Sequence, residues 1–287
     1  MNFKRLYLQL VDWFDSPSGF EDFDIWRHRL YQDQTQGKVS NLPLKTWWPK
    51  YSRVGTDFRL ELCLGAILVQ QISWPGVQRC LENLRDHLEN TGRDFDAEGI
   101  LSIPPETLED LLRPSRFAAA KTRNILRLCA HLREQDSLDA WFRNRGRGEF
   151  GHELRELKSG FGPETRDCVL LYAANIPAFI ADAYARKLLL LLTGHDWDYG
   201  SCQRAFEAGI ERDFSRTDLE EIRGDYKPDE LSYALCNSQK QDPGLVLLYQ
   251  QFHAGIVELG ISKRWEEFAC EHQLAGGRPP SRRDHSQ

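Results

Sequence analysis

The sequence contains no closely spaced pair of cysteines, no excess of basic residues and no long apolar run. The nearest two of its seven cysteines, Cys63 and Cys80, are 17 residues apart, which excludes the CxxC pairs of zinc and redox sites. The net charge of -6 excludes attraction to nucleic acid by the overall field, so any such contact needs a local basic patch or backbone donors. The longest apolar run, LLLLL at 188–192, is too short to span a bilayer.

A secretion signal is also missing. The amino end, MNFKRLYLQLVDWFDS, is interrupted by Asp12 and Asp15 and is typical of an amphipathic helix. An odd, scattered set of cysteines without a signal peptide indicates reduced thiols. We therefore expect a cytoplasmic protein with no membrane contact.

Strand patterns are absent, because no stretch alternates apolar and polar residues with β-branched enrichment. Apolar residues instead recur at helical spacing in three long segments, 58–72, 77–89 and 118–134. The segment 102–112 opens with a Pro-Pro pair and continues into acids, as a helix start does. An all-α protein is therefore predicted, with a less regular stretch at 194–230 that we interpret as an insertion.

Two glycines, one residue apart, stand in the middle of the stretch LKSGFGPETRDCVLLYA, residues 157–173. The pattern predicts a short helix at 153–158, a tight turn and a second helix at 163–174, with Pro163 at its first position. Glycines leave the backbone bare, and free N–H groups at a helix start suit a phosphate. The ordinary interpretation of the same pattern is a packing corner between two helices.

The surrounding pattern L-x-x-L-x-x-G-F-G-P-E-T, followed by IADAYARKLL at 180–189, resembles the helix-hairpin-helix DNA glycosylases of the endonuclease III superfamily. Three further segments are similar to family segments and stand in the family order: 58–84, 113–129 and 248–260. In the second of them Arg116 stands where glycine is usual. The resemblance covers roughly residues 45–190 and 245–262, and its strength lies in the order and spacing of four segments.

The resemblance implies two helical domains with the active cleft between them. A barrel domain is expected over 55–176, including the helix-hairpin-helix at about 153–174. Residues 1–54 with 177–274 are expected to form the second domain, and the Gly- and Pro-rich tail 275–287 to be disordered. The implied partner is double-stranded DNA that contains a damaged base, bound by a monomer.

Two departures from the family pattern reduce the number of activities and cofactors that we expect. Bifunctional members carry a lysine where Glu164 stands, and a carboxylate cannot form their covalent imine with the sugar. We therefore expect a monofunctional enzyme without β-lyase activity. Many members also hold a 4Fe–4S cluster on four cysteines after the closing helix, whereas only Cys270 follows it here. No cofactor or metal is expected, and Lys263 is the nearby candidate for the modified lysine that the branch can hold instead.

Glutamate at the hairpin and the WWP of 47–49 resemble the 3-methyladenine DNA glycosylase III branch. The resemblance implies that Trp48 and Trp74 stack on the flipped base and that Trp47 and Pro49 line the wall. An electron-rich indole face binds a cation, and an N-alkylated purine carries positive charge. The ordinary role of these tryptophans is core packing.

Asp182 stands at the family spacing after the hairpin, which implies the catalytic carboxylate. Once the nucleotide is flipped out of the duplex, the carboxylate would stabilise the developing positive charge on the sugar and orient or deprotonate water. Without the resemblance, Asp182 would be interpreted as the N-cap of the helix that follows. Both roles are compatible.

The resemblance also implies a set of DNA contacts around the hairpin. Either Gln70 or Gln71 would fill the gap left by the flipped base, with Gln70 at the better-matching position. Lys121 is either a surface lysine or a phosphate contact. The expected DNA-binding residues are Gly160, Phe161, Gly162, Glu164, Thr165, Gln70 and Lys158.

Two other functions fit the same residues. One is a glycosylase of this fold that acts on a different damaged base, either deaminated or oxidised. The other is a DNA-binding repair module that has lost catalysis, although a pure binder has no need for an acid at Asp182.

Overall fold

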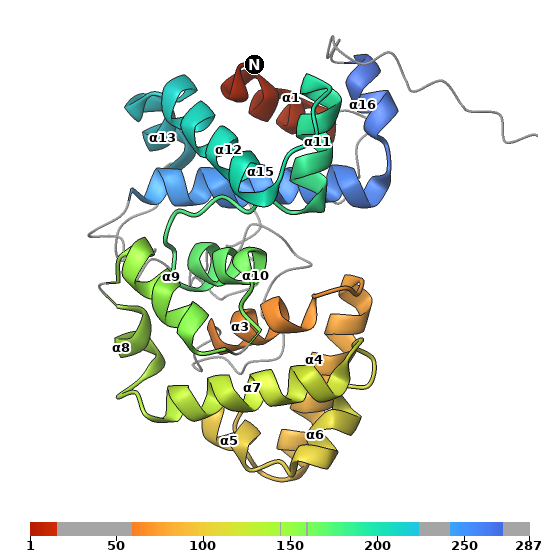
Figure 1. Ribbon diagram of the computed structural model, residues 1–287, viewed down its shortest axis with the longest axis vertical. Helices are drawn as coiled ribbons and strands as arrows, with labels where there is room; N and C mark the ends of the chain where they lie inside the picture. The colour runs from red at the N-terminus through yellow and green to blue at the C-terminus, as the bar shows by residue number, and fades with distance from the viewer. Residues whose placement is uncertain (16–58, 144, 159, 224–241, 272–287) are drawn as a thin grey trace, which may run out of the picture.

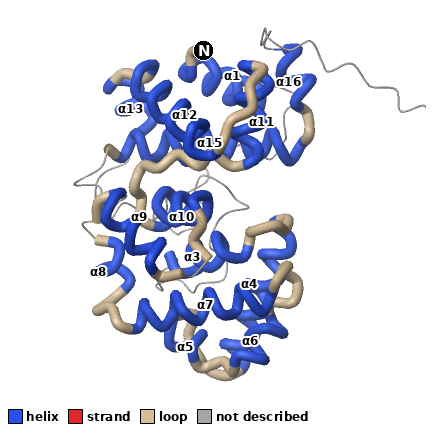
Figure 2. Tube along the Cα trace, viewed as in Figure 1, coloured by secondary structure: helices blue, strands red, loops and turns tan. Residues whose placement is uncertain are grey.

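The computed structural model describes residues 1–15, 59–143, 145–158, 160–223 and 242–271. Helices and the loops between them make up these residues, with no strand in any of the five ranges (Figure 2). The predicted all-α fold is confirmed. Figure 1 shows two groups of helices, with α15 running across the molecule where the groups meet.

The lower group in Figure 1 comes from the middle of the chain and contains the hairpin. Its helices are α3 (Arg59–Leu68), α4 (Trp74–Asn90), α5 (Ala97–Leu101), α6 (Pro105–Leu111), α7 (Ala118–Arg133), α8 (Leu138–Phe142), α9 (Arg147–Glu156), α10 (Pro163–Cys168) and the π-helix η1 (Val169–Ala173). The upper group combines the amino-terminal helix with the helices that follow the hairpin. It consists of α1 (Phe3–Asp15), α11 (Ala183–Thr193), α12 (Tyr199–Asp213), α13 (Arg216–Arg223), α15 (Pro243–Ser262) and α16 (Trp265–Glu271).

Each group surrounds its own cluster of buried apolar side chains. The first cluster draws on residues from Leu60 to Ala178, with Trp141, Phe142 and Phe150 among its largest members. In the second, α1 packs on residues of α11, α12 and α15. The π-helix supplies side chains to both clusters. It therefore lies on the boundary between the two cores.

The structure corrects the predicted hairpin and insertion. The first hairpin helix begins at Arg147 rather than at 153, because Phe150 and Leu154 already point into the core. The second hairpin helix widens to a π-helix after Cys168. The described part of the stretch 194–230 is two regular helices, α12 and α13, and α12 buries Phe206 at the centre of the second core. It belongs to the fold and is not an irregular insertion.

The chain crosses from the lower to the upper group through residues 174–182, and α12 fixes this crossing. The Phe179 N–H donates to Glu207 Oε1 at 3.0 Å, and its carbonyl accepts from Gln203 Nε2 at 2.7 Å. The Phe179 ring stacks on Phe206 with 4.2 Å between the ring centroids. The segment that leads to Asp182 is therefore held by its backbone as well as by its side chain.

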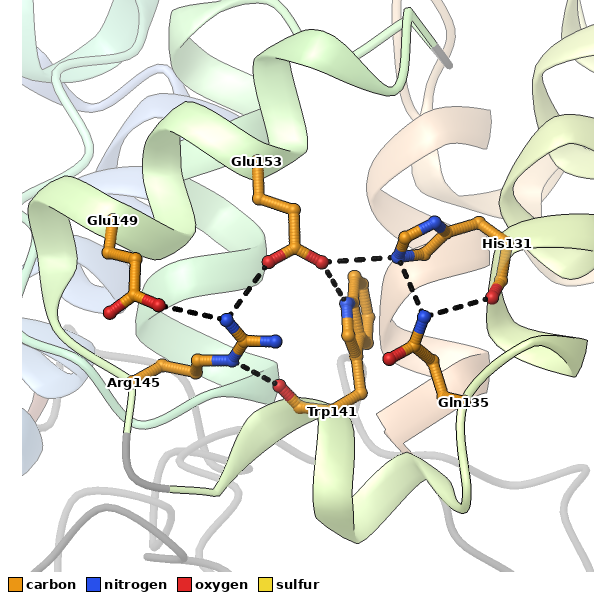
Figure 3. A network of polar contacts seen from close by, with 6 residues as sticks. All are labelled: His131, Gln135, Trp141, Arg145, Glu149 and Glu153. Atoms are coloured by element: carbon orange, nitrogen blue, oxygen red, sulfur yellow. Dashed lines mark hydrogen bonds and ion pairs between the residues drawn. The ribbon is translucent and has the colours of Figure 1, made fainter.

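A network of polar contacts around Glu153 joins α7, α8 and α9. The Trp141 indole N–H donates to Glu153 Oε1 at 2.7 Å, and His131 Nε2 lies 3.1 Å from the same oxygen. Arg145 Nη1 pairs with Glu153 Oε2 at 3.2 Å. Figure 3 shows these side chains converging on Glu153, with Gln135 below His131 and Glu149 to the upper left of Arg145. The network therefore anchors the first hairpin helix.

Substituting Glu153 with alanine is expected to lower the free energy of unfolding by about 1–3 kcal/mol, because the indole N–H of the buried Trp141 loses its acceptor and Arg145 loses one of its partners. Glu149→Ala is the matched control, since Glu149 is on the same helix but 69% exposed and pairs only at the surface. Urea unfolding should show a change of under about 1 kcal/mol for the control. Equal changes in both variants would contradict the anchoring role.

Candidate active site

A cavity of about 450 Å³ lies where the two groups of helices meet. Its lining comes from α3, the α3–α4 loop, the start of α4, α10, η1, the start of α11, and α15. The apolar side chains of the wall include Leu62, Ala66, Val69, Ile72, Trp74 and Val257. The polar groups that reach it include Glu164, Tyr172, Asp182 and His253. A mostly apolar cavity with a few converging polar groups is the usual form of a small-molecule site.

Asp182 is the N-cap of α11, and its side chain also lines the cavity. Oδ1 accepts a hydrogen bond from the Ala185 N–H at 2.8 Å, which satisfies one of the free donors at the start of the helix. Oδ2 lies 3.7 Å from Nε2 of His253. The side chain is 15% exposed. One oxygen is thus committed to the fold, whereas the other faces a buried imidazole at the cavity.

His253 is held in place from its other side. Its ring lies almost fully buried on α15, and Nδ1 is 2.8 Å from the hydroxyl of Tyr172. Tyr172 belongs to the π-helix, and burial raises the pKa of its hydroxyl well above the ordinary value, so the hydroxyl stays protonated. The Tyr172 ring and hydroxyl therefore fix how the imidazole faces Asp182.

Glu164 opens α10 at the edge of the cavity, with its side chain exposed. Desolvation by the surrounding walls raises the pKa of its carboxyl, and the negative charge of Asp182 raises it further. His253 and Arg186 act in the opposite direction. The charge of Asp182 and the desolvating walls therefore both disfavour a negative charge on Glu164.

Trp74 is the first residue of α4, and its half-buried indole lines the cavity. The ring lies against Gly65 of α3, where a Cβ atom would stand 3.6 Å from Trp74 Cη2. Glycine at this position leaves room for the ring against the helix backbone. The other expected base contacts, Trp47, Trp48 and Pro49, lie outside the described residues.

The hairpin turn takes a left-handed backbone at Lys158 and Gly160, with φ of 49° and 78°. A Cβ at Gly160 would stand 2.3 Å from Asn124 Nδ2 and would displace that amide, and the left-handed backbone itself favours glycine. At Gly162, the N-cap of α10, a Cβ would meet no atom within 4 Å. The exposed Lys158 and the open backbone at Gly162 are the outward parts of the turn.

Three of the expected DNA-binding side chains point inward instead. Phe161 is buried in the first core, where it anchors the turn. Thr165 is also buried, and its Oγ1 accepts from Gln70 Nε2 at 2.8 Å. The same Gln70 amide donates to the carbonyl of Gly160 at 2.8 Å. These side chains hold the hairpin against α3, which leaves the neighbouring Gln71 as the exposed residue of the pair.

Lys121 has neither of the roles considered from the sequence. Its side chain is buried, and Nζ donates to the carbonyls of Leu68 at 2.7 Å and Gln70 at 2.9 Å. The last carbonyls of a helix have no donor within the helix, so Lys121 caps the carboxyl end of α3. Burial lowers the pKa of its ammonium.

Phe117 is a residue that the sequence analysis overlooked. It has a left-handed backbone at the N-cap of α7, and its side chain is 58% exposed. The Arg116 guanidinium lies 5.4 Å from the ring centroid. The neighbouring Pro114 carbonyl is close to Gly76 at the start of α4, so this loop adjoins the α3–α4 loop. The sequence signal that could have found Phe117 is an aromatic residue directly after the RPSR turn of 113–116.

The remaining expectations concern metals, thiols and membranes. Across the described ranges, no three or more His, Cys, Asp or Glu side chains are grouped as metal ligands would be. Six cysteines are described, all as free thiols. Lys263 is exposed at the carboxyl end of α15 with φ of 59°. None of the described helices combines the length and apolar character needed to cross a membrane.

Comparisons with known proteins agree with this geometry. The chain is 27% identical over 175 residues to a provisionally named DNA repair glycosylase of Methanocaldococcus jannaschii, covering 59% of this chain and 73% of that protein. The structure is similar to the crystal structure of Helicobacter pylori 3-methyladenine DNA glycosylase bound to 1,N6-ethenoadenine, with a TM-score of 0.58. That match has 25% sequence identity and covers 78% of this chain and 91% of the other.

The sequence pattern of a protein family matches as well. It spans residues 64–212, more than half of the chain, and runs from α3 through the hairpin and Asp182 to the end of α12. The resemblance seen in the sequence is thereby confirmed, and the chain belongs to the HhH-GPD superfamily of base excision DNA repair proteins.

Proposed function

We propose that this protein is a monofunctional DNA glycosylase that flips an alkylated purine, such as 3-methyladenine, out of duplex DNA and hydrolyses its glycosidic bond. The observation that carries the proposal is the Asp182 carboxylate, which shares a largely apolar cavity of about 450 Å³ with the indole of Trp74. The substrate named for the Helicobacter pylori relative supports the choice of an alkylated base.

DNA would be held at the edge formed by the hairpin and the two loops beside it. The first-turn N–H groups of a helix lack partners within the helix, so those of Glu164 and Thr165 suit a phosphate at the open turn of Gly162. This contact needs no excess of basic residues, which accounts for a DNA-binding chain with a net charge of -6. Exposed Lys158 adds a cation at the same turn.

Two exposed side chains at this edge are suited to the distorted duplex. Gln71 and Phe117 both take a left-handed backbone, each with φ of 61°. Such conformations are costly for residues other than glycine and concentrate at functional sites. We propose that Gln71 fills the gap left by the flipped base and that Phe117 stacks against the neighbouring bases, since aromatic rings accept any base as a partner.

Cleavage of the glycosidic bond would depend on the charge of the base and on the position of the Asp182 carboxylate. An alkylated purine is already cationic and leaves readily, so the enzyme need only stabilise the sugar as positive charge develops on it. Asp182 Oδ2, on the cavity side of the carboxylate, supplies the negative charge and a contact for the attacking water. Trp74 offers an indole face to the cationic base.

Replacing Asp182 with asparagine should lower the rate of base release from methylated duplex DNA by roughly 10²–10³-fold, because the negative charge is lost while the shape is kept. Asparagine caps a helix as well as aspartate does, so the melting temperature should change little. Asp198→Asn makes the same change at the exposed N-cap of α12 and should keep the wild-type rate. An Asp182→Asn variant within a few-fold of wild type would refute the catalytic assignment.

The product should be an intact abasic site, because Glu164 offers a carboxylate where an imine-forming amine would be needed. Damaged duplex incubated with the enzyme should therefore break only after alkali treatment. Borohydride should trap no covalent complex between protein and DNA. A trapped complex would show that a lysine elsewhere in the chain attacks the sugar.

Cationic methylpurines should be released faster than neutral lesions such as uracil and hypoxanthine. Trp74→Ala should slow release of 3-methyladenine by about tenfold or more, because one stacking face is lost. Trp197→Ala is the matched control, because this half-buried indole lies away from the cavity and donates a hydrogen bond to Thr193. A preference for uracil in the wild type would favour the alternative of a deaminated base.

A further inference from the structure

Lys121 lies beneath the edge at which DNA would bind, and it holds the α3–α4 loop by its backbone. Its side chain is only 3% exposed, and Nζ contacts the carbonyls of Leu68 and Gln70 at 2.7 and 2.9 Å. The carboxyl end of a helix is also the negative end of its dipole, which a cation stabilises. The end of α3 and the second residue after it are therefore fixed to α7.

Gln70 extends this chain of contacts to the hairpin. Its Nε2 donates to the carbonyl of Gly160 and to Oγ1 of Thr165, both at 2.8 Å. Gly160 in turn packs on Asn124, one turn along α7 from Lys121. The Arg127 guanidinium, a further turn along, donates to the carbonyl of Lys158 at 2.9 Å. One face of α7 thus supports both the loop and the hairpin.

Gln71 depends on these contacts for its conformation. The carbonyl of Gln70 and the N–H of Gln71 belong to one planar peptide unit, so a bond to that carbonyl orients the plane. Gln71 follows with φ of 61°, a conformation that persists only where the surroundings determine it. The Lys121 ammonium donates a hydrogen bond to the Gln70 carbonyl and so holds this peptide plane in place.

We propose that Lys121 is a positioning residue that orients Gln71 toward the gap in the duplex, and that Gln70 keeps the Gln71 loop in register with the hairpin. The inference rests on the proposed function, because the gap exists only once a base has been flipped out. Lys121 itself touches no DNA. It acts through the backbone of the loop.

The test is Lys121→Met in the full-length protein, with Lys4→Met as the matched control. Lys4 pairs with Asp218 between α1 and α13, away from the hairpin and its two neighbouring loops. Two readouts are needed: amide hydrogen exchange of Ile72 without DNA, and the ratio of affinities for a duplex with a tetrahydrofuran abasic analogue and for an intact duplex. The abasic analogue presents the gap, whereas the intact duplex reports contacts of the hairpin alone.

Lys121→Met should raise exchange at Ile72, the bonded amide of the loop, and reduce the preference for the abasic duplex by about tenfold, while affinity for the intact duplex stays within about twofold. Lys121→Arg, which keeps donors for both carbonyls, should recover part of the preference. Gln70→Leu breaks the same chain of contacts from the other end, and should cause a similar loss if Lys121→Met is too unstable to measure. Lys4→Met should match the wild type in both readouts.

An unchanged preference, or affinities for both duplexes that fall in proportion, would overturn the positioning role. Unchanged exchange at Ile72, whose N–H donates to the carbonyl of Val69 at 3.2 Å, would overturn it as well. Failure of the proposed function is seen separately, as a wild-type protein that releases no base from any damaged duplex. In that case the exchange measurement still decides whether Lys121 orders the loop.

Discussion

The placement of Asp182 depends on how the backbone of Phe179 is held between the two groups of helices. The cavity takes α3 and α10 from one group and α11 and α15 from the other, so its shape requires a fixed crossing. Gln203 and Glu207 of α12 bind both polar groups of the Phe179 peptide backbone, and Gln203 also reaches the fully buried Asp167 of α10 at 2.7 Å. Side chains of one helix thus fix the end of the hairpin and the segment that follows it.

Buried polar groups concentrate around this boundary, whereas the two cores are apolar. Burying a polar group is costly unless it is hydrogen-bonded, and the groups near the boundary have specific partners. Gln250 donates to the carbonyl of Leu171 at 2.9 Å in the π-helix, and Tyr199 donates to Asp167 at 2.8 Å. Such bonds add little net stability, but they are satisfied in one arrangement only. They therefore fix the register of one group against the other.

Much of this arrangement could be predicted from local patterns. Asp182 precedes an apolar run, and its role as N-cap follows from that position alone. The hairpin followed from two glycines and Pro163, because a left-handed backbone and a missing N–H are local properties. The limits of α9 were harder to predict, because glycines at 146, 148 and 151 favour a loop in isolation and only packing of Phe150 overrides them.

Other features depend on contacts that a single segment does not contain. Lys121 lies on the inner face of α7 with the buried residues Ile125, Leu128 and Leu132, whereas the sequence analysis considered only a surface lysine or a phosphate contact. A lysine on such a face usually extends to solvent, and only the end of α3 explains why this one does not. Phe161 and Thr165 lie in a motif known for DNA contact, yet their direction is set by the core and by Gln70. Phe117 is exposed because its loop takes a left-handed turn, which sequence periodicity does not reveal.

The π-helix at Val169–Ala173 makes the number of residues in this segment a structural constraint. Leu170 packs in the first core, whereas Leu171 and Tyr172 pack in the second, so each side chain has an assigned side. Deleting one residue would close the wide turn to α-helical geometry, so the turn would have one side chain fewer to divide between the two cores. Tyr172 contacts His253 from this turn at 2.8 Å, so the number of residues in the turn also bears on the cavity. The length of this segment is therefore set by the two cores together.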